Sequence, residues 1–180
     1  MALIMLEKSD REEALAYSET VLSNLKKTPN YTGLVESNRF FVGACGEIAF
    51  RKWAGMKGLR FEETSRDDGE SDKQDFILYA KKSGRPCSVN VKCSLHPNAH
   101  YLMQPQSQHM LHRQDMYIGA TGEDDGERVA IILAGAVTRK VFDQMAEECV
   151  VKIPTLRLSL ADLTYSMERV ANSFQKRREI

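Results

Sequence analysis

The stretch that decides the fold is Gln74-Asp75-Phe76-Ile77, followed by Lys81-Lys82-Ser83-Gly84-Arg85-Pro86 and then by Ser88-Val89-Asn90-Val91-Lys92. The glycine and the proline of the middle run separate two apolar segments, which predicts a hairpin of two strands over residues 75–80 and 87–93. Because side chains alternate along a strand, Asn90 and Lys92 are expected on one face and the two valines on the other.

This hairpin predicts a polar site on an otherwise apolar sheet. Asp75 opens the first strand, so pairing of the strands brings it beside Asn90 and Lys92. A lysine inside a valine-rich strand is costly unless it has a polar partner or a polar ligand. An acid, a carboxamide and an amine at one edge of a sheet are suited to hold a divalent cation and a phosphate.

Length and composition favour one globular domain. The chain has 180 residues, of which 42% are hydrophobic and 28% are charged, as in an ordinary soluble protein. We expect one domain over residues 1–180, with residues 1–36 as an N-terminal helical extension and residues 37–180 as the core. The formal net charge is zero, so any binding of nucleic acid must rest on local patches rather than on bulk charge.

Cysteine use and hydropathy predict a cytoplasmic location. The four cysteines are scattered without a Cys-x-x-Cys pair, which disfavours a structural zinc site and favours reduced thiols. The segment Met1-Ala2-Leu3-Ile4-Met5-Leu6 is too short, and too soon followed by acidic residues, for a signal peptide or a membrane span. We therefore expect no membrane partner.

Apolar periodicity predicts further elements on both sides of the hairpin. Helices are expected over residues 9–27, 40–56 and 139–148, and from about residue 159 to the C-terminal basic run. Strands are expected over residues 59–63, 116–120, 128–134 and 150–158, the last of them bent or at an edge because it contains Pro154. Residues 64–73 and 96–114 are expected to be irregular and polar. The predicted fold class is α/β, with a central mixed sheet of about five strands flanked by helices.

Three short motifs, taken in order, resemble those of a known group of enzymes. The first is the helical run Gly43-Ala44-Cys45-Gly46-Glu47-Ile48-Ala49-Phe50, the second is Asp75-Phe76, and the third is Asn90-Val91-Lys92, followed by Ser94. The set is similar to the PD-(D/E)xK nuclease superfamily, which includes restriction endonucleases, archaeal Holliday-junction resolvases and many phage nucleases. The resemblance covers roughly residues 47–94, about a quarter of the chain.

The resemblance implies a restriction-endonuclease-like fold and Mg²⁺- or Mn²⁺-dependent hydrolysis of phosphodiester bonds in DNA. By match, Asp75 would be the central metal ligand, and the residue at position 90 the second, with the backbone carbonyl of Val91 beside it. Lys92 would orient the attacking water or stabilise charge on the phosphorane. Glu47 would complete the metal site from its helix. Hard cations on oxygen ligands suit phosphoryl transfer, which needs charge neutralisation and in-line positioning.

The chain departs from this pattern at Asn90, where the superfamily has Asp or Glu. An amide is neutral and offers one oxygen, so it should bind Mg²⁺ less well than a carboxylate. Three interpretations are open: an engineered form in which Asn90 replaces a native aspartate to trap an intact complex, a natural active variant that relies on Asp75 and Glu47, and a natural inactive relative.

Plainer interpretations exist for single residues. Lys92 is also compatible with an edge-strand lysine that blocks aggregation, and Glu47 with an ion pair to Arg51. The histidines have no metal-ligand spacing and are expected to be solvated or to face a substrate. Further substrate contacts are expected from five polar residues: Ser94, Lys82, Arg85, Gln104 and Gln106.

Only two basic clusters occur in the sequence. One is Lys81, Lys82 and Arg85 at the hairpin turn, and the other is Lys176-Arg177-Arg178 near the C-terminus. Each alone is more typical of a solvated tip than of a phosphate contact.

Two other functions compete with a DNA endonuclease. A non-catalytic nucleic-acid-binding or regulatory protein on a nuclease scaffold is favoured by Asn90. A Holliday-junction resolvase would prefer branched DNA, and the neutral net charge counts against its strongly basic face. The small size suits a homodimer whose two sites address two strands, and a role in a phage, a mobile element or a restriction defence system.

Overall fold

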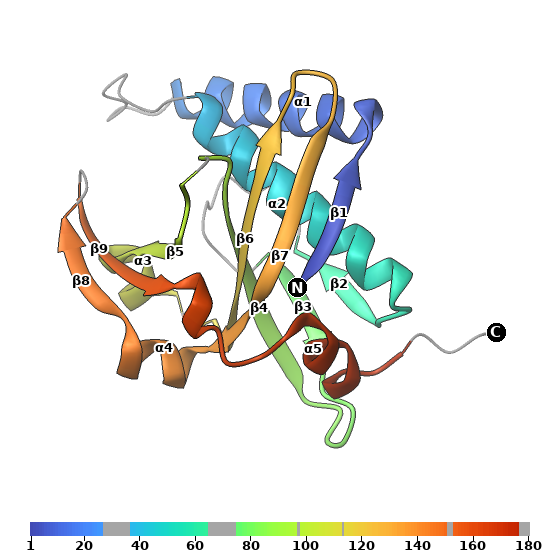
Figure 1. Ribbon diagram of the computed structural model, residues 1–180, viewed down its shortest axis with the longest axis vertical. Helices are drawn as coiled ribbons and strands as arrows, with labels where there is room; N and C mark the ends of the chain where they lie inside the picture. The colour runs from blue at the N-terminus through green and yellow to red at the C-terminus, as the bar shows by residue number, and fades with distance from the viewer. Residues whose placement is uncertain (27–36, 65–74, 97, 113, 151–152, 177–180) are drawn as a thin grey trace.

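The protein is a mixed α/β structure with two sheets (Figure 1). The computed structural model describes residues 1–26, 37–64, 75–96, 98–112, 114–150 and 153–176. A six-stranded mixed sheet has the order β1-β7-β6-β4-β3-β2, and a three-stranded sheet has the order β5-β9-β8. Among the described helices, none is long and apolar enough to cross a membrane.

The elements follow one another along the chain in this order: β1 (Ala2–Leu6), α1 (Lys8–Lys26), α2 (Ser37–Met56), β2 (Phe61–Glu63), β3 (Phe76–Tyr79), β4 (Pro86–Ser94), β5 (Tyr101–Pro105), α3 (Gln106–Leu111), β6 (Met116–Asp124), β7 (Val129–Thr138), α4 (Arg139–Met145), β8 (Glu147–Val150), β9 (Pro154–Ser159), the 3₁₀ helix η1 (Leu160–Asp162) and α5 (Met167–Ser173).

Strand β4 connects the two halves of the large sheet. It pairs antiparallel with β3, where Phe76 lies opposite Val89, and parallel with β6, where Asn90 lies beside Tyr117. Because β4 and β6 are parallel, the turn before β4 and the turn after β6 lie at opposite ends of the sheet. Figure 1 shows the β3–β4 turn at the foot of the molecule and the β6–β7 turn at its head.

The main core lies between this sheet and the helix pair α1 and α2. Val89 and Val91 point into it, together with the large aromatic residues Phe50, Trp53 and Phe76. The Phe50 ring lies 4.8 Å from that of Phe76 and 5.5 Å from that of Trp53, centroid to centroid. Fully burying a side chain of this size contributes about 1.5–3 kcal/mol, so the aromatic cluster holds α2 on the sheet.

A glycine sets the distance between α2 and β4. A Cβ atom added at Gly46 would lie 2.5 Å from the Cβ of Cys93 and 3.4 Å from a methyl carbon of Val91. No larger residue fits at this crossing without moving the helix. Helix α2 therefore covers the face of β4 that carries Val91 and Cys93, and the alternation of the strand sends Asn90 and Lys92 to the opposite face.

The opposite face of β6 is covered by the small sheet and its helices. A second core cluster joins the two layers and consists of Leu102, Tyr117, Val137, Phe142 and Leu158. A Cβ atom added at Gly119 would lie 2.6 Å from Leu160 and 2.9 Å from Leu163, so this strand position also needs a glycine.

Most of the expected elements are confirmed. The structure has helices over residues 8–26, 37–56 and 139–145, the β3–β4 hairpin, and strands at 61–63, 116–124 and 129–138. The large sheet has six strands where about five were expected. The polar segment 65–73 and residues 27–36 lie outside the described residues.

Three regions differ from the expectation. The segment Ala2–Leu6 is a strand that pairs with β7, within what was expected to be a helical extension. The segment 96–114, expected to be irregular, contains β5 and α3. Residues 150–158 are not one strand, because β8 ends at Val150 and pairs antiparallel with β9, which starts at Pro154. The last helix is also shorter, with η1 and a separate α5 in its place. Strands β1 and β5 form through pairing with strands distant in sequence, whereas β8 and β9 form a local hairpin.

Candidate functional site

Asp75 and Asn90 form a polar pair across the β3–β4 hairpin. The Asn90 side-chain amide donates to the Asp75 carboxylate over 3.4 Å, a long hydrogen bond, and the Val91 backbone N–H donates to its other oxygen over 2.6 Å. The Asp75 backbone N–H donates in turn to the carbonyl of Val89 over 2.9 Å. The hairpin register thus places the aspartate opposite the asparagine, as the sequence predicts.

The carbonyl oxygen of the Asn90 side chain lacks a partner. Asn90 is 5% exposed, and its Oδ1 atom makes no hydrogen bond with any described residue. A buried polar atom without a partner costs about 1–3 kcal/mol, so such atoms are rare in folded proteins. Trp53 Nε1, Thr64 Oγ1 and Gln104 Oε1 are in the same state, so the feature that sets Asn90 apart is its contact with the Asp75 carboxylate.

Lys92 and Ser94 follow Asn90 on the same face of β4. Both are half-buried, and Lys92 lies beside Gly119 of β6 in the parallel ladder. Leu160 and Leu163 fill the space over Gly119 on this face. Lys92 lies two residues along the strand from Asn90, on the same face of β4.

Glu47 lies on α2, one residue after the close contact of Gly46 with β4. This helix covers the face opposite to Asn90 and Lys92. The alternative ion pair of Glu47 with Arg51 has competitors, because the Arg51 guanidinium contacts Glu13 at 2.7 Å and Glu63 at 3.7 Å. The role of Glu47 as a metal ligand stays a prediction.

The two glutamines expected to contact substrate lie in the small sheet and its helix. Gln104 belongs to β5 and is 1% exposed, and its Oε1 atom has no hydrogen-bond partner among the described residues. Gln106 begins α3, and its amide donates to Glu148 over 3.2 Å. No contact that we observe joins either glutamine to the Asp75–Asn90 pair.

An aspartate that sequence reasoning missed lies on the other side of β4. Asp115 precedes β6, and its carboxylate accepts hydrogen bonds from the backbone N–H and the hydroxyl of Ser88 over 2.9 and 3.0 Å. Ser88 shares its strand face with Asn90, so acidic groups flank this face of β4 on both sides. The sequence signal was weak, because polar residues at strand starts are common.

His109 is buried, so the expectation that all four histidines are solvated or face a substrate is wrong for this residue. It is 7% exposed, and its ring nitrogens lie 2.8 Å from the Tyr117 hydroxyl and 2.6 Å from an Asp143 oxygen. Burial raises the pKa of Tyr117 to about 12. The network joins α3, α4 and β6 and has a structural role in fixing the small sheet.

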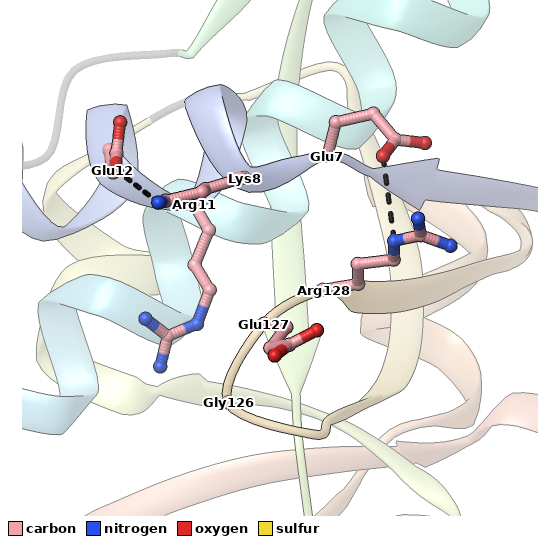
Figure 2. Close-up of a pocket in the computed structure, with 7 residues that line it drawn as sticks. All are labelled: Glu7, Lys8, Arg11, Glu12, Gly126, Glu127 and Arg128. Carbon is pink, nitrogen blue, oxygen red and sulfur yellow. Dashed lines mark ion pairs between the residues drawn. The ribbon is translucent and has the colours of Figure 1, made fainter.

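A surface pocket of about 510 Å³ lies at the other end of the large sheet (Figure 2). It is lined by Glu7, Lys8, Arg11, Glu12, Gly126, Glu127 and Arg128. Most of its charges are paired: Lys8 lies 3.9 Å from Glu12 and Arg128 lies 3.6 Å from Glu7. Tyr117, which lies beside Asn90 in the parallel ladder, is nine positions before Gly126 of the pocket lining, so the two features lie towards opposite ends of β6. The pocket is therefore a separate feature from the Asp75–Asn90 pair.

No protein-family model matches the chain, and no match was found among the curated proteins or the solved structures. Among the described residues, no group of three or more His, Cys, Asp or Glu side chains is arranged to hold a metal ion. The function must therefore be argued from the hairpin itself.

Proposed function

We propose that the protein is a metal-dependent nuclease that acts on DNA and has a restriction-endonuclease-like arrangement of strands and helices. The observation that carries this proposal is the Asp75–Asn90 pair. The Asn90 side-chain nitrogen donates to the Asp75 carboxylate, and the buried carbonyl oxygen of the same side chain has no partner among the described residues. Lys92 follows Asn90 on the same face of β4. Carboxylate and amide oxygens beside an amine are the groups that bind a hydrated cation and a phosphate.

The residues fit Mg²⁺ or Mn²⁺ as a weakly held cofactor. Mg²⁺ typically keeps several waters and binds through one or two carboxylates, so it does not need a cage of protein ligands. Asp75 would supply the carboxylate, and the Oδ1 of Asn90, which has no partner among the described residues, would accept a hydrogen bond from a metal-bound water or contact the ion. When bound, the cation would neutralise charge on the phosphate and lower the pKa of an attacking water.

The protein groups act by positioning and by charge. The N–H of Val91 holds one oxygen of Asp75 at 2.6 Å and so fixes the orientation of the carboxylate. Lys92 would stabilise negative charge on the phosphorane or orient the water that attacks it. Because Asn90 is neutral, the negative charge at the site is lower than in the two-carboxylate pattern, and metal affinity should be correspondingly low.

One observation favours a second candidate, a nucleic-acid-binding protein without catalysis. The Asn90 amide donates to Asp75, so the carboxylate already has two hydrogen-bond donors from the protein without any metal. In this candidate the pair stabilises the hairpin, and DNA binding does not depend on divalent cations.

A cleavage assay on supercoiled and linear DNA with Mg²⁺ and Mn²⁺ tests both candidates. The set contains the chain itself, Asn90→Asp, and Asn90→Asp combined with Asp75→Asn or with Lys92→Gln. We expect cleavage by Asn90→Asp, at least about a hundredfold faster than by either double variant, because loss of a metal ligand or of the cation removes charge stabilisation in the transition state.

Matched controls come from exposed residues of the same type. Asp162→Asn on η1 and Lys140→Gln on α4, each combined with Asn90→Asp, should cut as fast as Asn90→Asp alone. If no variant cuts duplex, single-stranded or branched DNA, or RNA, the nuclease proposal fails and the non-catalytic binder replaces it.

A further inference from the structure

The fold brings together basic residues that are far apart in the sequence. The segment after α5 runs beside the end of β3 and fills the edge of the large sheet that β2 leaves open. The backbone N–H of Lys81 donates to the carbonyl of Ser173 over 2.8 Å, and that of Gln175 donates to Tyr79 over 2.8 Å. On the other side of the segment, the backbone N–H of Arg60 donates to the backbone carbonyl of Gln175 over 2.9 Å.

The β3–β4 turn is held in place by this segment. Ala80 forms an antiparallel bridge with Phe174, and Leu59 forms another with Lys176. The amide of Gln175 also donates to the carbonyl of Ala80 over 3.4 Å. Phe174 is 4% exposed and belongs to the main core, so the segment is anchored by packing as well as by hydrogen bonds. The turn is therefore a fixed part of the surface.

We call the resulting cationic surface the basic end, and its members are Arg60, Lys81, Lys82, Arg85 and Lys176. All five side chains are exposed. Among the described residues, no acidic side chain lies within ion-pair distance of Lys81, Lys82 or Arg85. Figure 1 shows the β3–β4 turn and α5 next to each other at the foot of the molecule.

The acidic residues near the basic end are already engaged. Glu168 pairs with Lys57 at 3.0 Å, and Glu62 accepts a hydrogen bond from the Tyr79 hydroxyl over 2.5 Å. Asp115 accepts hydrogen bonds from the backbone N–H and the hydroxyl of Ser88. The Arg60 guanidinium stacks over the Tyr79 ring at 4.1 Å from its centroid. A flat cation on an aromatic ring leaves its edge N–H groups available to phosphate oxygens.

We propose that the basic end binds the phosphate backbone of a nucleic acid. Mutual repulsion of like charges is a cost, and it is relieved when a polyanion lies across them and counterions are released. The net charge of the whole chain is zero, so this local excess of positive charge is balanced elsewhere on the surface. The partner class rests on the proposed function, whereas the existence of a polyanion surface rests on the charges alone.

The position of the basic end relative to the Asp75–Asn90 pair fits one bound strand. Arg85 immediately precedes β4 and lies five positions before Asn90, which is about 17 Å along an extended chain. Successive phosphates of one strand of a duplex advance about 3.4 Å along the axis, so the distance corresponds to roughly five nucleotides. A backbone held at the basic end therefore extends to the polar pair, and the surface positions the strand without reading its sequence.

The test measures binding without cleavage. A fluorescein-labelled duplex is titrated with protein in EDTA at several salt concentrations between about 50 and 200 mM, and affinity is followed by anisotropy. The variant Lys81→Gln/Lys82→Gln/Arg85→Gln should lose at least about tenfold in affinity at low salt and about two to three units in the slope of log K against log salt.

The matched control is Lys8→Gln/Lys26→Gln/Lys140→Gln, which changes the net charge equally at exposed positions on α1 and α4. It should keep the affinity within about twofold and the slope within about one unit. An equal loss in both triple variants, or no loss at the basic end, overturns the proposal. Preferential binding to vesicles of phosphatidylcholine with phosphatidylserine, with no binding to duplex, overturns it in favour of an anionic membrane surface.

Failure of the nuclease proposal gives a different result. The titration contains no metal and leaves Asp75, Asn90 and Lys92 unchanged, so a protein that never cuts still binds through the basic end. A protein that cuts, but whose basic-end variant binds and cuts normally, retains the proposed function and refutes this interface.

Discussion

The two hairpins of the large sheet lie at opposite ends of the molecule and treat their charges in opposite ways. In the β6–β7 hairpin, Asp125 accepts hydrogen bonds from the backbone N–H groups of Glu127 and Arg128 over 2.8 and 2.7 Å. Asp124 pairs with Arg11 through both carboxylate oxygens, over 3.0 and 3.1 Å. Asp124, Asp125 and Arg128 of this tip thus have partners within the protein.

In the β3–β4 hairpin, by contrast, polar or charged groups at both ends lack partners among the described residues. Its turn carries Lys81, Lys82 and Arg85 without acidic partners among the described residues, and its open end carries the unpaired Oδ1 of Asn90. Native proteins satisfy nearly all buried polar atoms, and groups left unsatisfied concentrate where a ligand or a reaction needs them. We therefore propose that the β6–β7 hairpin contributes stability and that the β3–β4 hairpin contributes binding.

Of the changes considered, Asn90→Asp should have the largest effect on stability. The substitution removes the amide donor and sets a second carboxylate against Asp75 at a position that is 5% exposed. We expect a loss of about 3 kcal/mol in the free energy of unfolding at neutral pH, because a buried charge then lacks a partner. The single tryptophan, Trp53, is 2% exposed in the core, and its fluorescence reports the urea transition.

Mg²⁺ should restore a large part of this loss, because an ion that binds only the folded state stabilises it by mass action. Asn172→Asp, which makes the same change at an exposed position of α5, should be close to neutral with and without Mg²⁺. If Mg²⁺ stabilises neither variant, the pair is not a metal site.

The Arg11–Asp124 pair should show the next largest effect. The two side chains are 23% and 22% exposed, and a bidentate guanidinium–carboxylate contact is stronger than a single exposed ion pair. A double-mutant cycle with Arg11→Met and Asp124→Asn should give a coupling energy of about 1–2 kcal/mol. The exposed Lys8–Glu12 pair, with 3.9 Å between its atoms, should give almost none, and equal coupling in the two cycles would contradict the assignment.

The same pair predicts an acid-dependent loss of stability. The hydrogen bond from Arg11 holds the pKa of Asp124 below its ordinary value. As pH falls, the unfolded chain therefore takes up this proton first. The stabilisation is complete above the unfolded pKa of about 3.9 and is lost as pH falls through the lower pKa of the folded state. The stability difference between the protein and Asp124→Asn should stay constant from about pH 7 to pH 5 and shrink below about pH 4 in urea titrations. A difference that instead shrinks on raising the pH would have the wrong sign.

The two hairpins also show what could be predicted from the sequence. The β3–β4 hairpin is encoded locally by Gly84, which has φ +68°, and by the proline two residues later. Its register follows, and with it the contact of Asp75 with Asn90. Strand β1 was not predicted, because its five residues become a strand only by pairing with β7, more than a hundred residues away.

The elements within segment 96–114 were not predicted for a related reason, and neither was the joining of the two basic clusters into one surface. In β5 the buried residues are Leu102 and Gln104. They are buried only because the small sheet packs on β6, so the sequence alone does not show an apolar alternation here. The basic end needs the segment after α5 to pair beside Tyr79, a contact that no local pattern encodes. Local chemistry therefore predicted the candidate site, whereas long-range pairing decided which surface surrounds it.

The smallest expected effect is the sharpest test of the contrast. Replacing Lys81, Lys82 and Arg85 by glutamine removes charges that have no acidic partner among the described residues, so the midpoint of thermal unfolding should shift by less than about 2 °C. At low salt the shift should be upward, because repulsion among the three cations is relieved, and it should vanish when salt screens them. Calorimetry at low and high salt measures both. A marked loss of stability would mean that these side chains support the hairpin. The contrast between the two hairpins would then fail, because the charged side chains of both turns would stabilise the fold.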